Sequence, residues 1–124
     1  MIAYAEADIE VNSTPKIVIH NSNSVILNEF EITGNDITSV LKKSFAYCND
    51  NAGLNNVLTI KIPEGKYLIK KTNVASSNTI LDLTDNVVIY NACPRRGNII
   101  NSPNGFYGYD GLKNFTVRDR KAHV

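Results

Sequence analysis

Aspartates in the second half of the chain are the first residues whose spacing could support chemistry. Asp82 and Asp85 stand three positions apart, and Asp110 and Asp119 form the next pair. Glycoside hydrolysis needs two carboxylates roughly 5 to 10 Å apart across a bound sugar. Asp82, however, alternates with two leucines as an outward-facing strand residue does, and Asp85 lies in a Thr-Asp-Asn turn. We therefore predict no catalytic residue in this chain.

Two other segments have side chains that suit sugar recognition. Arg95 and Arg96 follow each other in Cys-Pro-Arg-Arg-Gly, and their planar guanidinium groups would fit the carboxylates of an acidic polysaccharide. Tyr107 and Tyr109 lie in a segment rich in glycine and aromatic residues and could stack on sugar rings. A solvated loop and an aromatic lid on the core explain the same residues. From these four residues we predict weak binding of acidic polysaccharide.

Metal ligands and cofactor motifs are sparse. The sequence has two histidines, His20 and His123, and two cysteines, Cys48 and Cys93, all far apart from one another. A metal site needs more ligands than these residues supply, so we predict neither a metal nor a cofactor. The cysteines form either one disulfide or two buried thiols.

Composition indicates one globular domain. The chain has 124 residues, of which 43% are hydrophobic and 20% charged, and its formal net charge is +1. Lysine and arginine are scattered, whereas a nucleic-acid-binding surface would concentrate them on one element with interleaved aromatic residues. No apolar run approaches the roughly 20 residues that a membrane-spanning helix needs. We therefore predict no nucleic-acid partner and no membrane span.

The N-terminal residues allow two interpretations. Ala5, Glu6 and Ala7 match the small-x-small pattern before a signal-peptidase site, but the basic and long apolar regions of an export signal are missing. The segment is either a trimmed signal or an ordinary tail. We interpret residues 1–15 as a flexible arm and 16–124 as one domain, in a protein that is secreted or at the cell surface.

Hydrophobic periodicity predicts many short strands and one helix. A period of three and four from Asp36, a natural N-cap, to Cys48 predicts the helix. Alternation and turn residues predict strands at 16–20, 25–32, 58–62, 67–70, 79–83, 87–90 and 112–117, with a weaker one at 99–100. The connections of three to seven residues lack hairpin-type Asn-Gly turns, which favours a solenoid whose open end the helix covers.

Three motifs, taken in order, resemble the N-terminal section of the pectate-lyase-like superfamily of right-handed parallel β-helices. They are a helix start, a Pro-x-Gly-x-Tyr strand end and a Ser-Asn-x-x-Leu-x-Leu strand. The matching residues are Asp36, Thr38, Pro63, Gly65, Tyr67, Ser77, Asn78, Leu81 and Leu83. Ile37 stands where the family has a second Asp, and the usual Gly-rich loop before the helix is absent. The resemblance covers about residues 25–118 and implies a mostly β fold, a parallel β-helix fragment with one capping α-helix.

The resemblance also implies a function. Lyases and glycoside hydrolases of this superfamily hold their catalytic groups on later coils, and none of those motifs occurs in this chain. We therefore expect the N-terminal cap and first coils of an exported polysaccharide-processing protein, without activity of its own. The alternative is a noncatalytic surface, carbohydrate-binding or structural module. Phe115 and Val117 would lie at an open C-terminal end of the solenoid, which predicts self-association.

Overall fold

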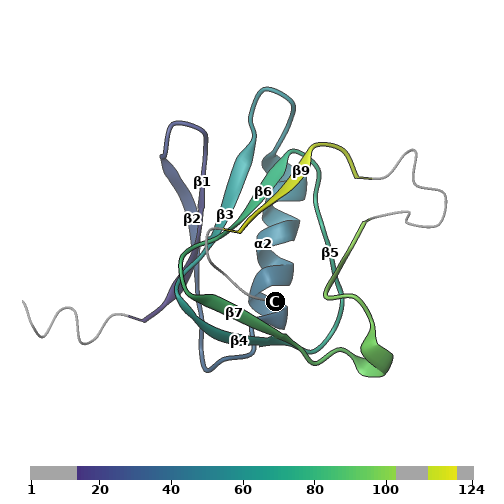
Figure 1. Ribbon diagram of the computed structural model, residues 1–124. Coiled ribbons are helices and arrows are strands. Elements are labelled where there is room, and N and C mark those ends of the chain that lie inside the picture. The colour runs from purple at the N-terminus through teal and green to yellow at the C-terminus, as the bar shows by residue number, and fades with distance from the viewer. Residues whose placement is uncertain (1–13, 103–111, 120–124) are drawn as a thin grey trace, which may run out of the picture.

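Short strands and one α-helix make up the computed structural model, which describes residues 14–102 and 112–119 (Figure 1). The helix is α2 (Thr38–Asn51), and a 3₁₀ turn, η1, spans Pro94–Arg96. The strands are β1 (Lys16–His20), β2 (Ile26–Glu31), β3 (Leu58–Ile62), β4 (Gly65–Ile69), β5 (Asn73–Val74), β6 (Thr79–Leu83), β7 (Val87–Asn91), β8 (Ile100–Asn101) and β9 (Phe115–Asp119). Within the described ranges, no helix is long and apolar enough to cross a membrane.

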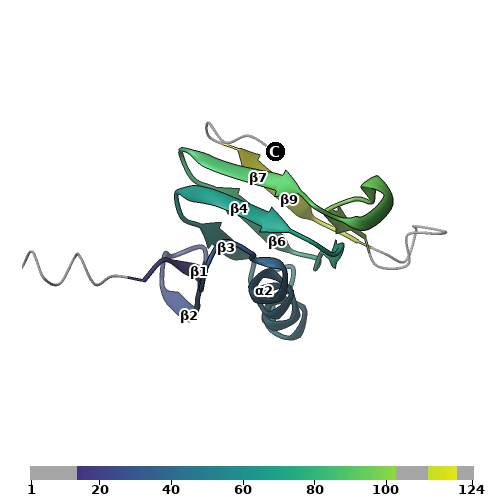
Figure 2. The same ribbon diagram turned by 90° about the horizontal axis from the view of Figure 1, so that it is seen from below.

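These strands form three sheets. The largest has the order β2-β1-β3-β6-β9, in which β1 pairs antiparallel with both β2 and β3. From β3 through β6 to β9 the pairing is parallel and free of register shifts. Two smaller parallel sheets, β4-β7 and β5-β8, complete the set. Figure 2 shows β3, β6 and β9 stacked on one side, with β4 and β7 beside them and α2 at one end.

Alternating apolar residues explain why these segments form strands. In β3, Leu58, Ile60 and Ile62 are completely buried, while Lys61 between the last two is exposed. In β1, Ile17 and Ile19 are completely buried in the same core. Inward-facing residues of all three sheets thus meet in one hydrophobic cluster, which α2 joins from the side.

Helix α2 begins close to the predicted position and buries the predicted face. Leu41, Ser44, Phe45 and Cys48 are its buried residues, spaced at three and four as an amphipathic helix requires. Its N-cap residue is Ile37 rather than Asp36. Asp36 still accepts hydrogen bonds at the helix start, from the backbone N–H and the hydroxyl of Thr38. Asp36 therefore stabilises the helix start as predicted, but from the position before the N-cap residue.

The mostly β fold with one helix is confirmed, but the right-handed parallel β-helix is wrong. The largest sheet is mixed because an antiparallel hairpin joins it, and the two other sheets have two strands each. The helix also does more than cover one end, since the ring of Phe45 lies 6.0 Å from that of Phe115 on β9, the strand at the opposite edge from the hairpin. Period-two alternation is the same in parallel and antiparallel strands, so it could not distinguish these arrangements.

Strand positions agree better with the sequence than the architecture does. The segments at 16–20, 58–62 and 79–83 have the predicted bounds, and the others are displaced by a few residues. One strand was missed: β5 lies within a segment predicted as a turn because of its Asn and Ser residues. Its two residues are too few to show alternation.

Steric contact with Tyr67 explains the glycine in the Pro-Glu-Gly-Lys-Tyr segment. Gly65 has φ 153°, and a Cβ atom there would lie 2.7 Å from the hydroxyl oxygen of Tyr67. The Tyr67 hydroxyl donates to the carbonyls of Pro63 and Glu64, at 2.8 and 3.0 Å. Burial, and to a lesser extent the charge of Glu64, raise the pKa of Tyr67. Glycine is therefore needed at this turn because the tyrosine ring folds back over it.

We expect Phe45→Ala to lower the free energy of unfolding by about 3 to 5 kcal/mol, because it removes a large buried side chain and leaves a cavity beside Phe115. Urea titration followed by circular dichroism measures the change. Lys43→Ala, at an exposed position of the same helix, is the control and should stay within about 0.5 kcal/mol of the parent. Equal stability of the two variants would contradict the place of α2 in the core.

Candidate ligand-binding groove

A groove lies between α2 and residues 71–76. Its volume is about 500 Å³, within the range of small-ligand sites. The helix contributes one face, with Thr38, Lys42 and Asn49 among the lining residues. Lys71 and Thr72 line the opposite wall at the start of the segment that contains β5. We call this hollow the lysine groove.

Charge and polarity distinguish the lysine groove from the core beneath it. Lys42 and Lys71 are exposed, and no aspartate or glutamate is among the lining residues. Asn73 is buried, and its side-chain amide donates to the backbone carbonyl of Thr38 at 3.3 Å, which links the two walls. Val74 is 54% exposed and adds an apolar contact surface. The groove thus offers two cations, several neutral polar groups and an apolar wall.

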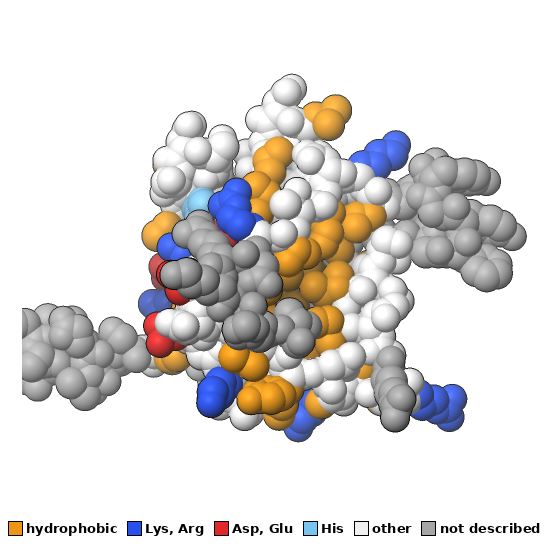
Figure 3. Space-filling view, viewed as in Figure 1, with side chains coloured by type: hydrophobic (Ala, Val, Ile, Leu, Met, Phe, Trp, Pro, Cys, Tyr) orange, Lys and Arg blue, Asp and Glu red, His pale blue; other side chains and the backbone are white. Residues whose placement is uncertain are grey.

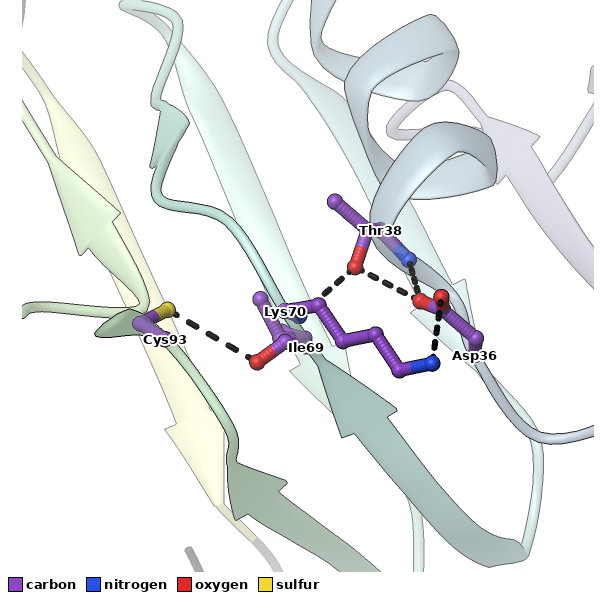
Figure 4. Close-up of polar contacts among 5 residues, drawn as sticks. All are labelled: Asp36, Thr38, Ile69, Lys70 and Cys93. Carbon is purple, nitrogen blue, oxygen red and sulfur yellow. Dashed lines mark hydrogen bonds and ion pairs between the residues drawn. The ribbon is translucent and has the colours of Figure 1, made fainter.

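A network around Thr38 fixes one end of the groove (Figure 4). The Thr38 hydroxyl donates to Asp36 Oδ1 at 2.6 Å and accepts from the backbone N–H of Lys70 at 2.8 Å. The Thr38 backbone N–H donates to the same Asp36 oxygen at 2.9 Å. Lys70 Nζ lies 3.9 Å from Asp36 Oδ2, but both side chains are well exposed, so this ion pair contributes little. The hydrogen bonds hold the first turn of α2 against the end of β4.

The hydrogen bonds to Asp36 favour its ionised form. The side-chain hydrogen bond from Thr38 has the largest effect, followed by the one from its backbone, and together with the nearby Lys70 they lower the pKa of Asp36. Asp36 therefore stays charged at neutral pH, at the margin of the groove but outside its lining.

The predicted binding residues are only partly described by the structure. Arg95 is exposed in the Pro94–Arg96 turn with φ 55°. This turn is joined to the groove because the hydroxyl of Thr72 donates to the carbonyl of Asn98, two residues past the turn. Tyr107 and Tyr109 lie outside the described residues, and so does the side chain of Arg96. The turn that contains Arg95 therefore lies near the lysine groove, through the hydrogen bond between Thr72 and Asn98.

Sequence reasoning missed the lysine groove itself. Its lysines belong to pairs, Lys42 with Lys43 and Lys70 with Lys71, which were interpreted as solvated surface. Helical spacing could have placed Lys42 on the same helix face as Asn49, but nothing local in the sequence brings Lys71 to that face.

Figure 3 shows further Lys and Arg side chains along the side of the molecule formed by β4, β7 and Pro94–Arg96, whereas the visible Asp and Glu side chains gather near β1 and β2.

The two aspartates whose side chains the structure describes in this half of the chain, Asp82 and Asp85, lie in different environments. Asp82 is on the outer face of the large sheet as predicted, yet it is only 1% exposed. Its register neighbours are Lys61 and Arg118, and Arg118 Nη1 lies 3.8 Å from its carboxylate. Asp85 is exposed in the turn before β7. Asp110 lies outside the described residues, as does the side chain of Asp119. The environment of Asp82 therefore indicates a structural role: it lies between two cationic residues of the neighbouring strands.

Both cysteines are buried free thiols, which answers the question that the sequence left open. Burial raises the pKa of Cys48 to about 11, and a hydrogen bond with Thr79 offsets only part of this effect. The Cys93 thiol donates to the carbonyl of Ile69 at 3.6 Å (Figure 4).

No group of three or more His, Cys, Asp or Glu residues that could hold a metal ion occurs within residues 14–102 and 112–119.

Comparison with known proteins yields no match to a family model, to a curated protein or to a solved structure. The resemblance to the pectate-lyase-like superfamily therefore stays a prediction from sequence motifs.

We expect Asp36→Ala to lower the free energy of unfolding by roughly 1 kcal/mol at pH 7, because the start of α2 loses its hydrogen-bond acceptor. The folded state lowers the pKa of Asp36 below its ordinary 3.8. Its charge-dependent contribution is therefore present above that value and is lost as the pH falls through the folded pKa. Asp36→Asn keeps an acceptor and should retain most of the stability but lose this pH dependence. A parent and an Asp36→Asn variant that lose stability in parallel between pH 5 and 2 in urea titrations would contradict the assignment.

Proposed function

We propose that this chain is a noncatalytic module that binds acidic polysaccharide in the lysine groove. The observation that supports the proposal is the charge of the lining: Lys42 and Lys71 are exposed on opposite walls, and no carboxylate lines the space between them. Two cations about a common groove attract carboxylate groups, and the nearest acid that the structure places there, Asp36, lies at the margin and not in the lining. Arg95, in the turn joined to Thr72, would add a bidentate contact to a carboxylate.

The remaining groups of the groove suit a sugar better than a simple anion. Asn49 offers an amide that can donate to and accept from sugar hydroxyls, and the Thr72 hydroxyl, which donates to the carbonyl of Asn98, can still accept. The half-exposed Val74 offers an apolar surface for the C–H face of a pyranose ring. A site that combines a few polar groups with apolar walls is typical of small-ligand binding. We therefore favour a uronic-acid polymer over phosphate or nucleic acid, and we extend the proposal to a secreted or cell-surface location, where such polymers occur.

The double variant Lys42→Gln/Lys71→Gln should bind polygalacturonate at least about tenfold more weakly than the parent, because two charge-assisted contacts are lost. Isothermal titration calorimetry at low salt measures the affinity, and binding by the parent should weaken as salt is added. Reducing-end and unsaturated-product assays on the same samples should show no turnover above a heat-treated control.

Lys43→Gln is the matched control, since Lys43 is exposed on α2 next to Lys42 but does not line the groove. It should bind polygalacturonate as the parent does. Equal loss of affinity in Lys43→Gln and Lys42→Gln would mean that net charge rather than the groove determines binding, and the proposal would fail.

Self-association is a second candidate, favoured by the edge of the large sheet. Among the described residues, β9 pairs with β6 alone, so its other side is free. Val117 on β9 is 50% exposed and lines an apolar hollow of about 380 Å³ together with Ile99, Ile100 and neighbouring residues. Phe115, also expected to be bare, is half-buried against the core. The hollow has no charged lining residue, so a second copy can face it without like-charge repulsion.

Antiparallel pairing of β9 with β9 of a second copy, centred on Val117, would place Arg118 opposite Thr116 and bury both hollows. Val117→Lys should then shift the chain from dimer to monomer in sedimentation velocity at micromolar concentration, because it places a charge in the apolar contact. Leu54→Lys, at an exposed apolar residue far from β9 in sequence, should leave the dimer intact. A parent chain that sediments as a monomer would rule out this second candidate.

A further inference from the structure

A second basic hollow lies on the outer face of the large sheet, away from the lysine groove. Its volume is about 350 Å³. Strand β1 lines it with alternate residues, Lys16, Val18 and His20, whose positions on one face follow from the burial of Ile17 and Ile19 on the other. Lys61 on β3 is the register neighbour of Val18 and completes the set of cationic side chains. Figure 3 shows a histidine side chain next to Lys or Arg side chains on this part of the molecule.

The β1–β2 turn builds one wall and is tied down by its own hydrogen bonds. The side chain of Asn21 accepts from the backbone N–H groups of Asn23 and Val25, at 2.9 and 3.0 Å. The backbone of Asn21 pairs with Ser24 and Val25. Ser24, with φ 63°, lines the hollow from this turn. Ser24 thus belongs to a turn whose internal hydrogen bonds fix it before any ligand arrives.

The orientation of His20 leaves one ring nitrogen for a ligand. Its Nδ1 lies 2.9 Å from the carbonyl oxygen of Asn21, and because a carbonyl can only accept, Nδ1 carries the hydrogen. Nε2 is then the nitrogen that remains for another partner. The β1–β2 register shifts between Ile19 and His20, as in a β-bulge, and sets His20 opposite Ile26. Bulges of this kind redirect side chains next to functional sites.

Acidic neighbours compensate only part of this charge. Glu29 Oε1 lies 3.4 Å from Lys16 Nζ, but both side chains are about 40% exposed, so the pair is weak and a ligand can replace it. Asp82, the β6 neighbour of Lys61, is buried with Arg118 Nη1 3.8 Å away, so its charge is shared with a second cation. Lys61 itself is exposed.

The remaining walls are apolar. Val18, Ile26 and Pro63 line the hollow, and Ile26 is 56% exposed. Sugar hydroxyls would find few partners there, whereas a compact anion attached to an apolar group would satisfy both parts of the lining. Two lysines, a histidine and a hydroxyl group are suited to a phosphate, which accepts hydrogen bonds on several sides. We propose that this hollow binds a phosphate monoester whose organic part is small and apolar.

Phenyl phosphate is the probe for this site, with phenol and inorganic phosphate as its two halves. Amide and methyl NMR shifts of the full chain, followed during titration, should move saturably at Val18, Ser24 and Ile26. The monoester should bind at least about fivefold more tightly than either half, because each half uses only one kind of wall. Inorganic phosphate that binds as tightly as the ester would overturn the proposed ligand class, and the absence of saturable shifts would overturn the site.

Variants locate the binding. Lys61→Gln and His20→Gln should each weaken phenyl phosphate binding by about tenfold, since each removes a charged or hydrogen-bonding partner. Lys43→Gln, on the exposed face of α2, removes the same charge elsewhere and should leave the affinity unchanged. If Lys43→Gln lost as much affinity for phenyl phosphate, net charge rather than this hollow would determine binding, and the proposed site would be refuted. Polygalacturonate binding by His20→Gln should match the parent, so this test and that of the lysine groove can fail independently.

Discussion

The in-register parallel pairing of β3 with β6 is the constraint on which the other described elements depend. Leu58, Ile60 and Ile62 align with Thr79, Leu81 and Leu83, so two layers of apolar side chains face the same core. The sixteen intervening residues must leave the end of β3 and return to the start of β6 beside it. They include β4 and β5, which pair in parallel with β7 and β8. A shift of β6 by one residue against β3 would turn Leu81 and Leu83 away from the core.

This path also determines where the lysine groove lies. Residues 71–76 pass α2, and the side chain of Asn73 ties them to the helix by its hydrogen bond to the carbonyl of Thr38. Lys71, just past the end of β4, is thereby brought to the side of the helix on which Lys42 is exposed, although the two stand 29 positions apart in the sequence. The groove therefore lies directly over the core: its lining includes the buried Phe45 and Asn73 as well as the exposed Lys42 and Lys71.

Local pattern was sufficient for much of the fold but not for its topology or for the site. The alternation in Lys16–His20 and Thr79–Leu83 and the helical spacing from Ile37 to Cys48 predicted those elements because each buries one face. Alternation carries no information on strand direction, so the antiparallel β1–β2 hairpin was assigned to a parallel solenoid. Asp82 was placed on the correct face of its strand, yet its burial depends on the lysine and arginine of neighbouring strands and could not be deduced from Leu81 and Leu83. Lys42 and Lys71 are brought together by tertiary structure alone.

Net charge conceals how the surface is organised. A formal charge of +1 suggests no preference for an anionic partner, and by itself it argues against one. The described structure separates some of the charges, however. Asp82 is buried with Arg118 Nη1 3.8 Å away, and Asp36 accepts hydrogen bonds at the start of α2. The lining lysines Lys42, Lys61 and Lys71 are exposed, whereas Asp82 and Asp36 are in contact with Arg118 and Thr38. Because the interaction between charges falls off within about 10 Å at ordinary ionic strength, an anion approaching either hollow responds to the local cations rather than to the sum over the chain. A nearly neutral protein of this kind can thus carry two separate hollows lined by lysine, and in both proposals the other lining residues rather than the charge determine the ligand class.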